Sequence, residues 1–271
     1  MASRRRQSAF SLIELVMVIA ILGVIGATVA VFMRQPIDAY QATARRAALS
    51  DLADTAVRRM ARDIGRALPN SLRNPSNQCI EFIPTRTGGR YRAEPTAAGT
   101  GDILDFTTAD SSFGVFGDLS VLPADQRVVA GDLVVVYNLG IPGADAYEGD
   151  NTAVVASVAT GAESTITMAS KQFPLASPAN RFQVVPGDEK IVSFTCSGGR
   201  LLRSSNHAST NSCPTSGATV AVLANNVASC NFVYNGSDLQ RNAQVRMGMV
   251  LTDASGESVS LYHEVHVNNT P

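Results

Sequence analysis

Residues 10–33 read FSLIELVMVIAILGVIGATVAVFM, an uninterrupted apolar run in which Glu14 is the single ionisable side chain. As a helix this run would extend roughly 36 Å, whereas the hydrocarbon core of a bilayer is about 30 Å thick. No comparable apolar run follows in the rest of the sequence. The sequence therefore predicts one membrane-spanning helix over residues 10–33, followed by a large region outside the membrane.

The charges on either side of this run predict its orientation. Arg4, Arg5 and Arg6 precede it, and clustered arginines stay on the cytoplasmic side of a membrane. Arg34, just beyond the run, is a lone opposing charge. We therefore expect residues 1–9 in the cytoplasm. In a bacterium the chain would then cross the inner membrane once, with its C-terminal region in the periplasm.

The composition of the whole chain excludes some classes of protein. Its 271 residues are 45% hydrophobic and 17% charged, which is enough apolar material for a packed core and excludes a wholly disordered chain. The formal net charge is -1. Such a balance gives no electrostatic reason to expect a nucleic-acid partner.

Glu14 needs an explanation, because a carboxylate works against membrane insertion. An acidic residue at the centre of a membrane helix costs about 2.5 to 3.5 kcal/mol, and less toward the helix end. One interpretation is a side chain that reaches the cytoplasmic interface. The other is a carboxylate kept for a partner that becomes available only after processing or assembly.

The residues around Glu14 resemble the type IV prepilin motif, also called the class III signal. After a short basic leader, residues 8–15 read SAFSLIEL. The resemblance implies that a prepilin peptidase cuts between Ala9 and Phe10 and methylates the new amino terminus of Phe10. It also implies that Glu14 pairs with the amino terminus of a neighbouring subunit in a growing filament. The family usually has Gly where this chain has Ala9, and Thr where it has Ser11.

The apolar pattern becomes amphipathic beyond Pro36, a residue that predicts a kink or interruption of the helix. Apolar residues then recur at steps of three or four, as a stripe facing a globular domain requires. The stripe consists of Leu49, Leu52, Ala53, Ala56, Val57, Met60 and Ile64. Pro69 and Asn70 would end the helix. The sequence thus predicts an amphipathic periplasmic helix over residues 34–68.

Arginines repeat at every fourth position along another face of this helix. The row consists of Arg58, Arg62 and Arg66. It is partly offset by Asp54, and by Asp63 four residues after Arg59. We interpret the row as a solvated helix face. The alternative is a docking row for an acidic neighbour in a filament.

Short segments rich in Val, Ile, Thr, Phe and Tyr follow from Cys79 onward, separated by Gly, Pro, Asp and Asn. The clearest predicted strands are residues 103–107, 133–137, 153–158, 165–168, 182–185, 191–196, 230–234, 245–251 and 258–267, of which the last two would form a hairpin. We expect loops over residues 113–132 and 138–151. The predicted fold class is α+β, in which a long N-terminal helix with a membrane-spanning first half packs on an antiparallel β-sheet domain over residues 79–271.

This architecture is pilin-like, and several stretches resemble the MshO-type minor pilins of mannose-sensitive haemagglutinin pili. They are residues 45–49, 58–64, 79–84 and 261–267. The resemblance implies association with other pilins or pseudopilins through the N-terminal helix, and with an inner-membrane assembly platform. Major pilins are usually smaller than this chain. The size therefore favours a minor pilin, or a minor pseudopilin of a type II secretion system.

All four cysteines, Cys79, Cys196, Cys213 and Cys230, follow the apolar run. In an oxidising periplasm an even number favours two disulfides, and four cysteines allow three pairings. Cys213 and Cys230 flank the strand-like residues 219–223, so we favour a bond between them and, by elimination, one between Cys79 and Cys196. Free buried thiols remain the alternative. No CxxC pair suggests zinc or redox chemistry.

Residue types that catalysis requires do not converge in the sequence. The nucleophile, metalloprotease, phosphate-loop and dinucleotide motifs are absent, so we predict a non-enzymatic protein without cofactor or metal. His207 lies in a polar stretch and is expected at the surface. His263 and His266, three apart on a strand, would point to opposite faces. The acidic residues of 145–150 lack EF-hand spacing, which makes a calcium site improbable there.

Two classes of function remain. The first is a structural pilin that is processed at Ala9 and Phe10 and assembles through its helix. The second is a membrane-anchored periplasmic binding protein or enzyme whose N-terminus is only an anchor. An ordinary secretory signal peptide, cut near residues 25–27, would leave Glu14 unexplained.

Overall fold

The computed structural model describes residues 11–208, 211–213, 219–236 and 242–271. Contacts divide the chain into two compact units, the first ending at Ala48 and the second running from Leu49 to Pro271. One long helix, α1 (Leu12–Ile64), begins in the first unit and ends in the second. The rest of the second unit consists of β-strands and loops.

Helix α1 continues through Pro36 without a break, so the predicted interruption there is wrong. A proline removes one backbone hydrogen bond, to the carbonyl four residues earlier, and a 53-residue helix keeps its bonds on both sides. The helix ends at Ile64 and not at Leu68. The chain leaves it because the amide of Leu68 donates to the carbonyl of Ile83 at 2.7 Å.

The apolar stripe predicted for the second half of α1 is confirmed. Its buried members are Leu49, Ala53, Ala56, Val57, Met60 and Ile64. Ala53 and Ile64 are fully inaccessible to solvent, and Leu52 is half-buried against the same cluster. The small Ala side chains let the helix approach the strands closely, and the larger ones fill the space between. The helix is therefore anchored to the second unit by its own stripe.

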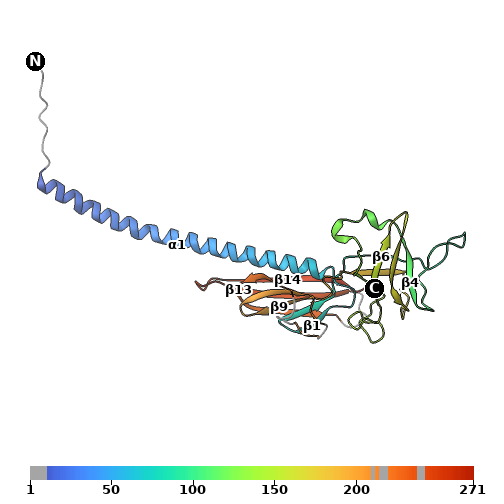
Figure 1. The fold of residues 1–271 in the computed structure, drawn as a ribbon. Helices are drawn as coiled ribbons and strands as arrows, with labels where there is room; N and C mark the ends of the chain where they lie inside the picture. The colour runs from blue at the N-terminus through green and yellow to red at the C-terminus, as the bar shows by residue number, and fades with distance from the viewer. Residues whose placement is uncertain (1–10, 209–210, 214–218, 237–241) are drawn as a thin grey trace, which may run out of the picture. The chain divides into compact units, whose positions relative to one another are not determined.

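The buried stripe of α1 packs with side chains from two antiparallel sheets, and together they form the first core of the protein (Figure 1). The first has the order β1-β2-β9-β10-β11, formed by β1 (Arg73–Ser76), β2 (Cys79–Phe82), β9 (Val192–Ser197), β10 (Arg200–Ser205) and β11 (Thr219–Asn225). The second has the order β12-β13-β14, formed by β12 (Val227–Asn235), β13 (Asn242–Thr252) and β14 (Ser258–Asn268). The hairpin of β13 and β14 was predicted and is confirmed by the pairing of Thr252 with Ser258.

A third sheet has its own core. Its order is β3-β8-β5-β6-β7-β4, formed by β3 (Thr87–Arg90), β4 (Asp110–Phe116), β5 (Leu133–Val136), β6 (Thr152–Ala159), β7 (Glu163–Lys171) and β8 (Arg181–Val185). An isolated bridge between Tyr91 and Val115 brings the two edges of this sheet together. Phe113, Phe182 and Ile166 are among the side chains buried in this second core. Two short 3₁₀ helices, Leu119–Val121 and Ala124–Gln126, lie between β4 and β5.

The third sheet is inserted into the first. Phe82, the last residue of β2, is the register partner of Val192, the first residue of β9. The chain between them, residues 83–191, contains every strand of the third sheet. A small separate cluster of buried side chains includes Leu68, Ile83 and Val185. Ile83 directly follows β2, and Val185 is the last residue of β8.

Most predicted strands are confirmed, and the misses have local causes. Residues 103–107 form no strand, because the carboxylate of Asp105 accepts hydrogen bonds from the amide of Thr107 and the hydroxyl of Thr108, which turns the chain. Strand β4 occupies part of the predicted loop 113–132. Its sequence, DSSFGVF, has too few β-branched residues to signal a strand. The α+β class itself, with a long helix packed on antiparallel sheets, is confirmed.

Candidate functional site at the start of the helix

The first turn of α1 is capped by Ser11. The backbone amide of Glu14 lies 3.3 Å from Ser11 Oγ and 3.1 Å from the Ser11 carbonyl oxygen. Ser11 is therefore the N-cap residue, and Glu14 occupies the position at which an acidic residue completes a capping box. The sequence pattern Ser-x-x-Glu signals this cap. The apolar run and the charges around it do not by themselves predict this role for Ser11.

Glu14 is exposed, and in the described part of the chain no hydrogen bond or ion pair engages its carboxylate. Its position in the first turn places a negative charge at the positive end of the helix dipole. This interaction offsets part of the cost of a carboxylate in an apolar segment. It leaves both carboxylate oxygens able to accept a further charged donor.

The apolar side chains that follow Glu14 are also exposed. From Ser11 to Gln41 every residue is exposed, including Leu12 at 82% and Phe32 at 72%. By length and composition α1 can cross a membrane, with a mean hydropathy of 2.8 over its most apolar window. An apolar surface of this extent needs lipid or other helices around it. Ala9 and Phe10, the predicted cleavage residues, lie outside the described residues.

The four cysteines form two disulfides, which confirms that they pair and corrects the favoured pairing. Cys79 is bonded to Cys213, and Cys196 to Cys230, with Cα separations of 5.8 and 6.4 Å. Cys79 and Cys196 cannot bond because Cys79 is the register partner of Thr195. Successive residues of a strand point to opposite faces, so the side chain of Cys196 lies on the other face of the sheet.

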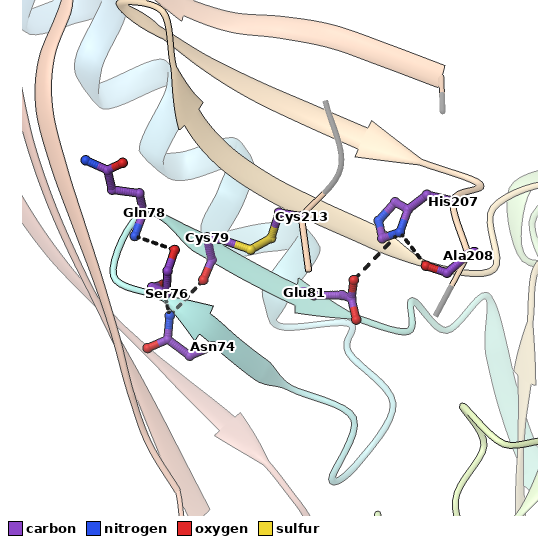
Figure 2. Close-up of a disulfide and its surroundings, with 8 residues drawn as sticks. All are labelled: Asn74, Ser76, Gln78, Cys79, Glu81, His207, Ala208 and Cys213. Carbon is purple, nitrogen blue, oxygen red and sulfur yellow. Dashed lines mark hydrogen bonds and ion pairs between the residues drawn. A yellow bond between two sulfur atoms is a disulfide. The ribbon is translucent and has the colours of Figure 1, made fainter. Parts of the chain in front are cut away.

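Beside the Cys79–Cys213 disulfide lies a buried ionisable pair (Figure 2). Glu81 is fully buried, and its Oε2 atom lies 3.7 Å from Nδ1 of His207. Burial raises the pKa of Glu81 to about 7, although the positive charge of Arg73 opposes the shift. The expectation that His207 lies at the surface is wrong, since 7% of the residue is exposed.

The surroundings of Glu81 explain why its pKa rises. Arg73 is its register partner on β1, but the guanidinium donates to Asp145 at 3.2 Å and stacks on the ring of Tyr147. No hydrogen bond to either carboxylate oxygen of Glu81 is found in the described part of the chain. A neutral carboxyl group is therefore favoured there. Strand register brings Arg73 beside Glu81, and loops far away in the sequence supply Asp145 and Tyr147.

The remaining candidate metal ligands lie apart from one another in the described part of the chain. The register partner of His263 is Met247, which is buried, and the partner of His266 is Gln244, which is only partly buried. This difference confirms that the two histidines lie on opposite faces of the sheet. In the acidic loop, Asp145 binds Arg73, as described above. Among the described residues no three His, Cys, Asp or Glu side chains are grouped as metal ligands.

Comparison with known proteins bears on the start of the chain. Residues 4–30 match a family model described as the prokaryotic N-terminal methylation motif. No curated protein and no solved structure gives a significant match. The chain thus carries a type IV prepilin-like motif, which supports a pilin or pseudopilin, implies processing by prepilin peptidase and association with other pilins, and fits an anchor in the inner membrane.

Proposed function

We propose that this protein is a structural minor pilin that prepilin peptidase cleaves between Ala9 and Phe10 and methylates at Phe10, and that takes part in assembling or initiating a type IV pilus of the MshO-containing kind. The observation that carries the proposal is the methylation motif at residues 4–30, which contains an exposed Glu14 without a partner in the described chain. A plain membrane anchor needs neither feature.

The capped helix start supports a role for Glu14 in assembly. Because Ser11 is the N-cap, cleavage before Phe10 would leave the new amino group one residue ahead of the helix. Glu14 follows Phe10 by four residues in the sequence and lies in the first turn of the helix. An amine and a carboxylate so spaced on one helix can pair with the carboxylate and amine of an adjacent helix. Each such pair would neutralise a charge that is costly in an apolar environment.

The middle of the membrane-spanning segment is suited to close helix contacts. Gly23 and Ala27, like Gly26 and Ala30, are four residues apart and so share a helix face. A Cβ atom placed on Gly23 or Gly26 would meet no atom of this chain within 4 Å. These positions are open to the backbone of another helix, as in membrane helices that associate through small residues.

We further infer that the C-terminal region is periplasmic, and that the subunit leaves the inner membrane through an assembly platform for the filament. The basic leader at Arg4, Arg5 and Arg6 supports this orientation. Two disulfides support an oxidising compartment. A minor pseudopilin of a type II secretion system is the second candidate, because the helix and motif are common to both. A minor pilin and a minor pseudopilin would differ in the globular region, which here includes the inserted third sheet.

The decisive experiment combines N-terminal mass spectrometry with filament or secretion assays in the native host. We expect a peptide that begins at N-methylated Phe10. Glu14→Gln keeps a side chain that can complete the capping box but removes the charge, whereas Ser11→Ala removes the cap and keeps the charge. We expect Glu14→Gln to abolish assembly while cleavage continues, and Ser11→Ala to retain most of the assembly.

Two results would overturn the proposal. One is a native N-terminal peptide that begins at Met1 or Ala2, or near Thr28, because each indicates an anchor or a secreted protein. The other is normal assembly and secretion by Glu14→Gln in cells that lack the native chain. Loss of secretion without loss of pili would favour the pseudopilin.

A further inference from the structure

A cleft of about 510 Å³ lies between the end of β14 and the ends of β5 and β8. The first core contributes Asn70 and Asn269 to its wall, and the inserted sheet contributes Tyr137, Leu139, Pro178 and Arg181. Its volume falls within the range of small-molecule sites, which often form where two packed regions meet. No acidic side chain lines it.

Arg181 brings to the cleft a positive charge that no acidic side chain of the lining neutralises, and the last two residues of the sequence, Thr270 and Pro271, complete the wall. Arg181 is on the outer face of β8, because the next residue, Phe182, is buried in the second core. The register of β3 and β8 places Arg90 directly opposite Arg181, and so on the same outer face. Neither guanidinium has a carboxylate partner among residues 11–208 or the other described segments. Like charges at paired positions repel, and a bound anion would relieve that repulsion.

Tyr137 contributes a strained aromatic side chain to the same cleft. Its φ of 51° is in the left-handed region, where the other non-glycine residues of the described chain are all asparagines. A bulky residue rarely adopts this conformation, because it is sterically strained. Asn138 holds it in place, since its Nδ2 atom donates to the carbonyl of Pro69 at 2.7 Å and its Oδ1 atom accepts from the amide of Ala146 at 2.8 Å.

This strain places a half-buried phenol ring against the second core and along the cleft. No hydrogen bond to the Tyr137 hydroxyl is found in the described part of the chain. Leu139 and Pro178 extend the apolar surface beside the ring. The cleft thus offers a planar apolar wall and a free hydroxyl group next to a free guanidinium.

On the opposite wall, Asn70 and Asn269 are already engaged in hydrogen bonds. The amide of Asn70 donates to Asn269 Oδ1 at 3.2 Å, and Asn70 Nδ2 donates to the carbonyl of Asn138 at 2.9 Å. Asn269 Nδ2 donates to the hydroxyl of Tyr234 at 3.2 Å. Of the polar lining side chains, Arg181, Tyr137 and Thr270 therefore remain to contact a ligand.

We propose that this cleft binds a sugar that bears a carboxylate, such as a uronic acid. The guanidinium of Arg181, supported by Arg90, would take the carboxylate, for which its planar donors are well matched. The ring of Tyr137 and the Pro178 side chain would cover the C–H face of the sugar, and the Tyr137 hydroxyl would bond a ring hydroxyl. A simple inorganic anion would use the charge and leave the apolar wall uncovered. The site is independent of the role proposed for the helix.

Binding can be tested on the full chain in detergent micelles by calorimetry and ligand-observed NMR. The probes are glucuronate, glucose as the uncharged sugar, and sulfate as the anion without a ring. We expect glucuronate to bind, with glucose and sulfate each at least about tenfold weaker. Arg181→Gln should weaken glucuronate binding at least about tenfold, and Arg90→Gln by a few-fold. Tyr137→Phe should weaken it by a few-fold through loss of the hydroxyl.

The matched control is Arg200→Gln, which removes an exposed arginine on β10 that does not line this cleft. It should bind glucuronate within about twofold of the native chain. Circular dichroism should show that Arg181→Gln folds as the native chain does, since Arg181 makes no ion pair there. The proposal is wrong if glucose binds as tightly as glucuronate, if sulfate does so, or if Arg181→Gln and Arg200→Gln bind alike.

Discussion

Arg203 on β10 connects the long helix to the first sheet, because its Nε atom donates to Asp63 Oδ2 at 2.8 Å. Its Nη1 atom also donates to Glu189 Oε1 at 2.6 Å. Asp63 was expected to offset Arg59 on the helix surface, and it instead binds a residue 140 positions away. The last turn of the helix is therefore fixed to the sheet by charge as well as by its apolar stripe.

Arg203→Ala should lower the free energy of unfolding of the second unit by about 2 kcal/mol, because it leaves two partly buried carboxylates without their partner. Chemical unfolding followed by circular dichroism would measure the change. Arg58→Ala is the matched control, since Arg58 binds Asp54 at an exposed site. Its effect should stay below about 0.5 kcal/mol. Equal effects of the two variants would mean that the Arg203 contacts add little.

Met60→Ala should cost about 2 to 5 kcal/mol, because Met60 is 1% exposed in the middle of the stripe and its loss leaves a cavity. Leu175→Ala removes an apolar side chain that is 43% exposed and should cost less than about 1 kcal/mol. Both can be measured by thermal unfolding. A small effect of Met60→Ala would indicate that the helix packs loosely on the sheets.

Glu81 should make the protein less stable as the pH rises. Its pKa is about 7 in the folded protein against an ordinary 4.5, so between these values the unfolded chain releases its proton first. The free energy of unfolding should fall through this window by roughly 3 kcal/mol and level off above pH 7. Glu81→Gln should remove this dependence. Parallel curves for the native chain and the variant, measured between pH 4 and 8, would contradict the expectation.

Peptide mapping under non-reducing conditions should link Cys79 to Cys213 and Cys196 to Cys230. The two bonds span sequence separations of 134 and 34 residues. By loop entropy, paired Cys→Ser variants should lose about 5 kcal/mol for the first and about 4 kcal/mol for the second. A peptide that joins Cys213 to Cys230 would show that the pairing described here is wrong.

Sequence predicts the helix well because the information is local. Glu14, the apolar run and the stripe around Met60 are each visible in one continuous stretch of sequence. Sheet contacts are different in kind, since they depend on which strands are neighbours. The pairing of Glu81 with His207, and of Cys79 with Cys213, joins strand β2 to loop residues that are far away in the chain. Strand β4 was not predicted because its serines and glycine are typical of a loop.

The cleft beside Arg181 shows the same limit. An isolated Arg, a Tyr at the end of a strand and an Asn after it carry no signal of their own. The role proposed for these residues depends on the register that pairs Arg90 with Arg181 and on the left-handed backbone at Tyr137. Neither can be read from residue types.

The register partnership of Phe82 and Val192 makes residues 83–191 a cassette. The chain leaves the first sheet and returns to it at one place, and the excursion carries an apolar interior of its own. A short turn from Phe82 to Val192 would preserve the strand order on both sides. Replacing this cassette would change the surface that the protein displays. The end of the helix would keep its position if the new segment also supplied the contacts that Ile83 makes with Leu68 and that Glu189 makes with Arg203.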